Sequence, residues 1–138
     1  MEFALVLPLL VLLVFGMLDF GKAYNYWNDA THLTAAGARF AAVNRKPLPA
    51  SSQSLQLQIR NQADTAELRN GGTSAVPAPA QVCVDFPNSV STYGEPVRVR
   101  MTFTYKFIPF LNILNKTITS STVMRLEAVP TTYSAGCA

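Results

Sequence analysis

The chain has 138 residues, a formal net charge of +3 and a hydrophobic share of 49%. This length allows one domain plus an anchor, and the basic residues are scattered without a Lys/Arg cluster, which argues against a nucleic-acid partner. If about 45 residues form one long helix, roughly 90 remain for a head whose small core is marginal without other support. We therefore expect an N-terminal helix over residues 1–46 and a globular head over residues 47–138.

The first stretch of the chain is an apolar run from Phe3 to Leu18, and Asp19 is the first charge after it. As a helix this run is about 24 Å long, slightly shorter than the ~30 Å core of a bilayer. It can still span a membrane if the residues that follow lie at the lipid–water interface, where aromatic rings concentrate. No Lys or Arg precedes the run and no small-residue cleavage site follows it, so we do not interpret it as a cleaved signal peptide. The expected interface residues are Phe20, Gly21, Ala23, Tyr24, Tyr26 and Trp27.

Glu2 lies directly in front of the apolar run. A carboxylate at the edge of a hydrocarbon segment is costly unless it has a partner, so such a residue is a functional candidate. Two interpretations remain open. In the first, Glu2 pairs with the α-amino group of its own chain or of a neighbouring copy. In the second, it reaches only the lipid headgroup layer.

Pro8 and Gly16 both lie inside the run. A proline in an ordinary helix interior removes a backbone donor and costs about 3 kcal/mol, and a glycine costs about 1 kcal/mol. In a bundle of helices, neighbouring chains re-satisfy the backbone. The two residues therefore mark the segment where the helix could bend or locally unwind during packing. Together with Glu2 they are our candidate residues for assembly register.

The helical pattern continues beyond the run, from Phe20 to Asn44. Alanine is frequent there, which suits the close approach of another helix. Pro47 ends the pattern because the residue before a proline avoids the α region. The expected helix-packing residues are Phe3, Leu7, Leu10, Val14, Leu18, Phe20, Tyr24 and Trp27, and the stripe continues through Leu33, Ala36, Phe40 and Val43.

A second helix is expected from a cap at Ser51 or Ser52 to about Leu68. The sequence Asn70-Gly71-Gly72 stops it, and a loop follows over residues 73–80. Its expected buried stripe is Leu55, Ile59, Ala63 and Ala66.

Three strands are expected after this loop. Residues 97–107 give the clearest signal, because apolar and polar residues alternate along the whole segment. Residues 81–86 and 118–126 alternate over shorter distances. The chain is therefore predicted to be α+β, with a three- to four-stranded antiparallel sheet and a helix on one face. The residues expected to face inward on the two shorter strands are Val82, Val84, Phe86, Ile118, Met124 and Leu126.

The connection at residues 108–114 is unusually apolar for a loop. As core it would form a short helical turn that plugs one end of the sheet. As surface it would be an apolar patch for a neighbouring subunit. We favour the core interpretation.

Cys83 and Cys137 are the two cysteines of the chain. An even pair in a chain with a membrane-export segment indicates a disulfide, and two free thiols are the alternative. The bond would close a loop of about 55 residues and contribute roughly 4 kcal/mol on the chain-entropy model. The tail over residues 133–138 lacks a pattern and is expected to depend on this bond for its order.

No residue constellation typical of catalysis or metal binding is found in the sequence. His32 is the single histidine and has no cysteine near it. The stretch Gly71-Gly72-Thr73-Ser74 lacks the lysine of a phosphate-binding loop, and no serine lies in a Gly-x-Ser-x-Gly motif. Asn115-Lys116-Thr117 matches the N-glycosylation pattern, which short stretches often match by chance. We expect no enzyme activity, no cofactor and no bound metal.

The N-terminal residues carry a family resemblance. The string Glu-Phe-Ala-Leu-Val-Leu-Pro from Glu2, then an aliphatic run, then Asp19-Phe20-Gly21-Lys22-Ala23-Tyr24, resembles the opening of TadE-like pseudopilins of the tight-adherence (Tad) branch of type IV pili. The resemblance extends to about Val43. It implies an inner-membrane precursor whose basic leader is removed by a prepilin peptidase, followed by assembly through the N-terminal helix with other pilins and an inner-membrane platform. In that family the glutamate lies several residues after the cut, whereas only Met1 precedes Glu2 here. Either the first mature residues are missing from the sequence, or the cut falls unusually close to Glu2.

Two functions fit these features. The first is a structural subunit of an extracellular Tad-type filament, held in the inner membrane before assembly. The second is a single-pass, membrane-anchored assembly factor whose head binds a partner in the envelope. The sequence does not distinguish a major subunit from a minor one, although the minor role is the commoner one in the family that it resembles.

Overall fold

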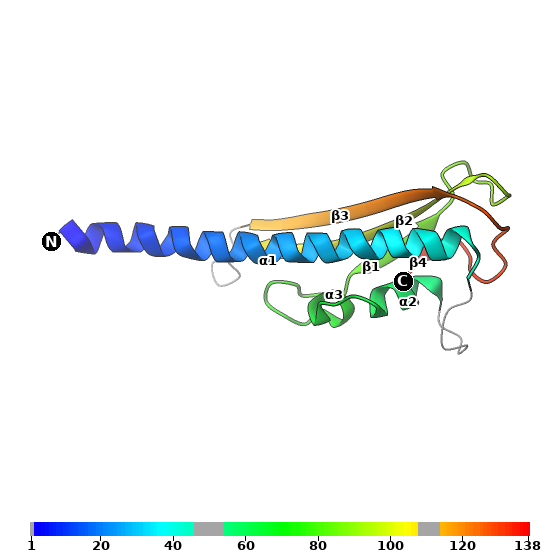
Figure 1. Cartoon of the computed structure of the whole chain (residues 1–138). Coiled ribbons are helices and arrows are strands. Elements are labelled where there is room, and N and C mark those ends of the chain that lie inside the picture. The colour runs from blue at the N-terminus through cyan, green and yellow to red at the C-terminus, as the bar shows by residue number, and fades with distance from the viewer. Residues whose placement is uncertain (1, 46–53, 108–113) are drawn as a thin grey trace.

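A computed structural model of the chain describes residues 2–45, 54–107 and 114–138, with the backbone alone at positions 2, 4 and 5. One helix, α1 (Glu2–Ala42), is 41 residues long, and a small head lies along its C-terminal half (Figure 1). The N-terminal half of α1 extends away from the head, with no other labelled element beside it. The helix is therefore both an exposed rod and one layer of the head.

The head contains a four-stranded antiparallel sheet with the strand order β3-β2-β1-β4. β2 pairs with β3 along its whole length, from Pro96 opposite Arg125 to Phe107 opposite Leu114. A long helix and an antiparallel sheet confirm the predicted α+β class. The strands are β1 (Gln81–Asp85), β2 (Pro96–Phe107), β3 (Leu114–Arg125) and β4 (Gly136–Cys137).

β2 forms the centre of the core because its side chains alternate strictly between two faces. Its inward residues are at most 3% exposed, while the residues between them are half-buried or exposed on the opposite face. The alternation predicted for residues 97–107 is confirmed. The inward residues are Val97, Val99, Met101, Phe103 and Tyr105.

The face of α1 that packs on the sheet consists mainly of small residues. Alanines at positions 30, 38 and 41 are fully buried, which allows the helix backbone to approach closely. Gly37 packs closely on the helix that follows rather than on the sheet, because a Cβ atom there would lie 2.6 Å from Cδ1 of Ile59. Residues from the expected helix (1–46) and from the expected head (47–138) thus share one hydrophobic core.

The expected second helix is present but is shorter than predicted: it is α2 (Leu55–Asn61), and a separate short helix, α3 (Ala66–Asn70), covers the end of the expected range. The hydroxyl of Ser54 accepts the Leu57 N–H at 3.3 Å and caps α2, while the expected caps lie outside the described residues. Of the expected stripe, Leu55, Ile59 and Ala63 are buried and Ala66 is exposed.

The break between α2 and α3 is caused by a side chain of α1. The carboxylate of Asp29 accepts the backbone N–H of Asp64 at 3.4 Å and that of Thr65 at 3.0 Å. It also accepts the Thr65 hydroxyl at 2.7 Å. Asp29 therefore satisfies the amides that precede α3, in the way that an N-cap side chain would.

β3 turns polar side chains toward α1, which its few apolar residues did not predict. Ser120 is 7% exposed, and its hydroxyl lies 3.2 Å from the hydroxyl of Thr34. Ser120 also donates to Thr31, and Thr122 donates to Thr34. The hydroxyls satisfy one another, so this seam can be buried without loss of hydrogen bonds. The inward orientation predicted for three apolar residues of this segment is confirmed. Leu126 is 1% exposed, and Ile118 and Met124 pack against the core.

The C-terminal tail is held at several places besides the disulfide, and its expected dependence on that bond for order stays a prediction. Val82 and Ala138 exchange two backbone hydrogen bonds of 2.9 Å. The hydroxyl of Tyr133 donates to the carbonyl of Ala41 at 2.8 Å. Asn44, which has a φ of 49°, accepts the backbone N–H of Thr132 at 3.1 Å. An asparagine tolerates this left-handed conformation better than most residues.

The apolar connection predicted as core lies largely outside the described residues, which resume at position 114. Leu114 itself is 55% exposed, so the core interpretation is wrong at this residue.

Candidate assembly surface

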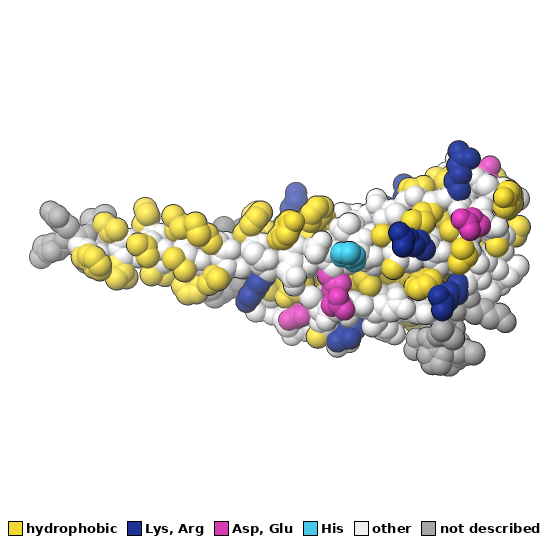
Figure 2. Space-filling view, in the orientation of Figure 1, with side chains coloured by type: hydrophobic (Ala, Val, Ile, Leu, Met, Phe, Trp, Pro, Cys, Tyr) yellow, Lys and Arg dark blue, Asp and Glu magenta, His cyan; other side chains and the backbone are white. Residues whose placement is uncertain are grey.

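The N-terminal half of α1 exposes apolar side chains around its whole circumference, and Figure 2 shows them in yellow on the face in view. Phe3 is 81% exposed and Met17 is 67% exposed. A helix that is apolar on every side is stable only when lipid or protein covers it. Helix α1 is long and apolar enough to cross a membrane. The exposed large residues of this half are Phe3, Val6, Leu7, Leu9, Leu10, Val11, Leu12, Leu13, Val14, Phe15, Met17 and Leu18.

Three predicted packing residues lie further along α1, outside the core of the head. Phe20, Tyr24 and Trp27 are 67%, 58% and 44% exposed. The core instead takes Ala23 and Tyr26, which lie on the neighbouring face of the same helix. Contact of the exposed set with other helices stays a prediction, as it does for Phe3, Leu7, Leu10, Val14 and Leu18.

Helix α1 is continuous through both of its expected weak points. Pro8 lies within the helix and lines a shallow apolar depression with Leu9, Leu12 and Leu13. At Gly16 a Cβ atom would meet nothing within 4 Å. Bending at these residues during packing therefore stays a prediction. Glu2 is the first residue of α1, and its side chain lies outside the described atoms.

Asp19, at the end of the apolar run, is tied to the sheet. The hydroxyl of Tyr105 donates to the Asp19 carboxylate at 2.5 Å and to its backbone carbonyl at 3.2 Å. Burial raises the pKa of Tyr105, and the hydrogen bond to Asp19 raises it further. The sequence showed Tyr105 only as an inward residue of a strand. A phenol tip on an otherwise apolar face, which needs a buried partner, was the available signal.

A shallow apolar groove lies beside this tie, where the exposed rod meets the head. It is formed by α1 and by the facing ends of β2 and β3. Tyr24 and Trp27 contact each other within it, with ring centroids 5.8 Å apart. The lining residues are Phe20, Ala23, Tyr24, Trp27, Phe107 and Ile118.

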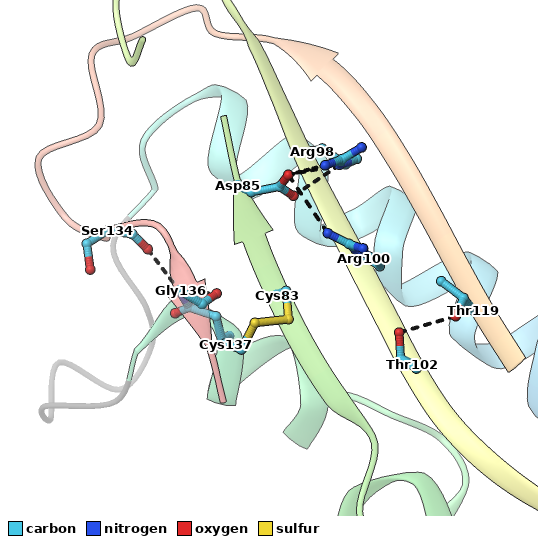
Figure 3. Close-up of a disulfide and its surroundings, with 10 residues drawn as sticks. Cys83, Asp85, Arg98, Arg100, Thr102, Thr119, Ser134, Gly136 and Cys137 are labelled. Atoms are coloured by element: carbon cyan, nitrogen blue, oxygen red, sulfur yellow. Dashed lines mark hydrogen bonds and ion pairs between the residues drawn. A yellow bond between two sulfur atoms is a disulfide. The ribbon is translucent and has the colours of Figure 1, made fainter. Parts of the chain in front are cut away.

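Cys83 and Cys137 form a disulfide, as predicted, between directly opposed residues of β1 and β4 (Figure 3). The bond spans 54 residues of sequence and fixes the tail on the sheet edge. Next to it, Gln56 of α2 donates to the carbonyl of Ser134 at 2.9 Å. The disulfide therefore lies at the β4 edge of the sheet, next to α2.

An ion pair lies close to the disulfide on the outer face of the sheet (Figure 3). Asp85 of β1 accepts hydrogen bonds from the guanidinium of Arg98 on β2, and Arg100 lies 4.0 Å away. The hydrogen bond from Arg98 lowers the pKa of the Asp85 carboxyl. Both side chains are about one-third exposed, so the pair contributes little to stability.

Within residues 2–45, 54–107 and 114–138, no three His, Cys, Asp or Glu side chains are grouped so as to hold a metal ion. His32 is exposed on α1. Among the described residues, the apolar rod and the groove at its base expose apolar surface to another molecule.

A family model described as TadE-like protein matches residues 1–39. The match covers nearly all of α1 and none of the sheet. The match supports an association of this protein with the Tad pilus. No match was found among curated proteins or among solved structures.

Proposed function

We propose that this chain, which is TadE-like over residues 1–39, is a structural subunit of an extracellular Tad-type filament that assembles through α1. The proposal rests on one observation: half of α1 is apolar on every side and lies outside the head. That half needs a cover, and both lipid and sister helices can supply one. The proposal gives the chain no catalytic role, cofactor or metal.

Before assembly, the apolar half of α1 lies in the inner membrane. Lipid tails are as apolar as leucine, so no hydrophobic force draws such helices together there. Outside the membrane the same side chains must leave water. Their burial against other copies is favourable by about 25 cal/mol per Å2 of apolar surface. We therefore place α1 of each subunit in the filament core and the heads outside.

Glu2 sets the register of one subunit against the next in this proposal. A buried carboxylate without a partner costs several kcal/mol, whereas a paired one is tolerated. An α-amino group at a similar depth is the partner that we propose. A subunit in the wrong register would leave Glu2 unpaired and would be rejected. Other pilins, the inner-membrane platform and the prepilin peptidase are the further partners that this function requires.

The Glu2→Ala variant tests the register role. We expect the precursor to remain in the membrane fraction while the polymer released by shearing cells is abolished or strongly reduced. Glu127→Ala is the matched control, since Glu127 is an exposed carboxylate of the head and should leave assembly unchanged. Normal filaments from the Glu2→Ala variant would rule out the register role.

A membrane-anchored assembly factor is the alternative. Lipid alone can cover the exposed apolar half of α1, without any sister helices. In that case α1 stays in the bilayer permanently and the head binds an envelope partner. Shearing separates the two functions. A subunit is released as a high-molecular-weight polymer, whereas an assembly factor remains with the membrane fraction.

A further inference from the structure

We propose that, before assembly, the head docks on the bilayer surface through the end of the sheet that lies nearest the exposed rod. We further propose that this surface prefers anionic phospholipid. This inference rests on the membrane-held precursor of the proposed function. We call the docking surface the interface collar. Its residues are Phe20, Lys22, Tyr24 and Trp27 of α1, with Lys106, Phe107, Leu114 and Lys116 of β2 and β3.

The geometry brings the end of the sheet to the membrane together with the helix. The Tyr105 hydroxyl bonds to Asp19, directly after the apolar run, and the Tyr105 ring lies 5.7 Å from that of Tyr26. Phe107 lies two residues beyond Tyr105 on β2. It pairs with Leu114 of β3, and this is the last pair of the β2–β3 ladder. In Figure 1 these strands run along α1, and their joined end points toward the exposed rod. When the apolar run spans a bilayer, this end reaches the interface.

The exposed side chains of the collar are of the kind that interfaces favour. Tyr24, Trp27 and Phe20 are between 44% and 67% exposed and lie on one side of α1. They line the apolar groove with Phe107 of β2. From Phe20 to Trp27 the helix rises about 10 Å, somewhat more than the ~5 to 8 Å headgroup zone on one side of a bilayer. Amphipathic rings are enriched at that depth in membrane proteins.

The charge at the collar complements an anionic surface. Lys22 and Lys116 are exposed and Lys106 is half-exposed. Two acids lie near this level: Asp19 accepts the Tyr105 hydroxyl, and Glu67 faces the hydroxyl of Tyr26. Figure 2 shows Lys and Arg side chains on both sides of α1 where the yellow rod meets the head. Basic residues at the end of a spanning helix are attracted to anionic headgroups within a Debye length.

A second copy of the chain is the other possible cover for the groove. Lys106 and Lys116, near the last pair of the β2–β3 ladder, favour lipid, because two copies that associate through this end of the sheet would bring like charges together. In the assembled filament the groove has left the bilayer. The docking therefore belongs to the precursor.

The test uses the full chain in lipid nanodiscs, with Trp27 as the reporter, since it is the single tryptophan of the chain. Trp27 fluorescence is measured while either phosphatidylglycerol or phosphatidylcholine carries brominated acyl chains, at equal mole fractions. We expect brominated phosphatidylglycerol to quench Trp27 about twofold more strongly, because the lysines enrich it around the collar. Equal quenching by the two lipids would overturn the proposal.

Charge reversal on the sheet separates docking from insertion of the helix. In the double variant Lys106→Glu with Lys116→Glu, the preference for phosphatidylglycerol should be lost while the chain still co-purifies with the discs. Arg125→Glu is the matched control on β3, because Arg125 is exposed at the opposite end of that strand. It should keep the preference. A preference that survives the double variant would contradict the collar.

Two other outcomes have distinct meanings. If neither brominated lipid quenches Trp27 and the chain is oligomeric in the disc, a second copy covers the groove, which overturns the docking but leaves the filament proposal intact. If the chain does not enter discs at all, the membrane-held precursor is wrong, and the proposed function and the docking fail together.

Discussion

At the scale of single residues, the hydroxyl of Tyr105 fixes where the exposed rod leaves the head. It is fully buried as a side chain and donates to Asp19 at 2.5 Å. We predict that Tyr105→Phe lowers the free energy of unfolding by about 1.5 to 3 kcal/mol, the range for a hydrogen bond to a charged group. Denaturant titration of the full chain in detergent micelles measures this loss.

Tyr93→Phe is the control for that substitution. Tyr93 is 76% exposed, so removal of its hydroxyl should change the free energy of unfolding by less than about 0.5 kcal/mol. Equal stability of the two variants would mean that the Tyr105–Asp19 bond does not hold the rod in place.

The hydroxyl of Tyr133 makes the stability of the head dependent on pH. It donates to the Ala41 carbonyl at 2.8 Å, and burial raises the pKa of Tyr133 to about 12. An unfolded tyrosine has a pKa of about 10. Its contribution to stability is therefore fully present below about pH 10 and is lost as the pH rises through about 12.

In the Tyr133→Phe variant, the free energy of unfolding should decrease less as the pH rises into the alkaline range. Wild type and variant are unfolded by denaturant at several pH values from about 8 to about 12. The two curves should converge toward the alkaline end, while the part due to Tyr105, whose pKa is also raised, remains in both. A constant difference between the curves over this window would show that Tyr133 does not contribute through its protonation.

At the scale of elements, two glycines of α1 have different surroundings. Their replacement by alanine should therefore change the stability of the protein in opposite directions. A Cβ atom at Gly37 would lie 2.6 Å from Cδ1 and 3.0 Å from Cγ1 of the buried Ile59, so either the Ile59 side chain or α2 must shift. We predict that Gly37→Ala destabilises the head by about 1 to 3 kcal/mol, the usual cost of overpacking.

Gly21→Ala is the matched substitution, because a Cβ atom at this position meets nothing within 4 Å. Alanine is the better helix former by about 1 kcal/mol, so this variant should be as stable as wild type or more so. Thermal unfolding followed by circular dichroism compares the two. If Gly37→Ala proves as stable as Gly21→Ala, the close contact of α1 with α2 is wrong.

An element in which apolar and polar residues recur with a regular period was predictable from sequence, because that spacing shows which face is buried. Strand β2 is of this kind, whereas α1 was predictable from its continuous apolar run and from the helical spacing that follows it. The break after α2 was not predictable, because it depends on Asp29, which lies 35 residues away from Asp64 in sequence. The same reason hid the seam of Ser120 with Thr34, since hydroxyl groups on a strand normally indicate a solvent-facing side.

The candidate surface was predictable in composition but not in orientation. Helical spacing placed Phe20, Tyr24 and Trp27 on one stripe, yet Tyr26 and Ala23 supply an equally good stripe on the adjacent face. Only the sheet decides between the two, since it takes Ala23 and Tyr26 and leaves the larger aromatic residues exposed. The tie between Asp19 and Tyr105 likewise joins residues 86 positions apart.

At the scale of the whole molecule, one helix serves two environments. Its C-terminal half is held in the head by the core, by Asp29 and by the Tyr105 hydroxyl. Its N-terminal half has no cover within the described chain. The head needs no partner to bury its core, whereas the rod does. This asymmetry is why we propose successive covers for the rod, first lipid and then sister helices.

The central claim is that the apolar half of α1 is retained and becomes covered by copies of the same chain. Electron microscopy of purified, sheared material tests it most directly. We predict regular filaments that contain this chain, with the α1 rods packed together along the axis and the heads outside. Solitary molecules, with residues 3–18 removed or still embedded in lipid, would contradict the claim.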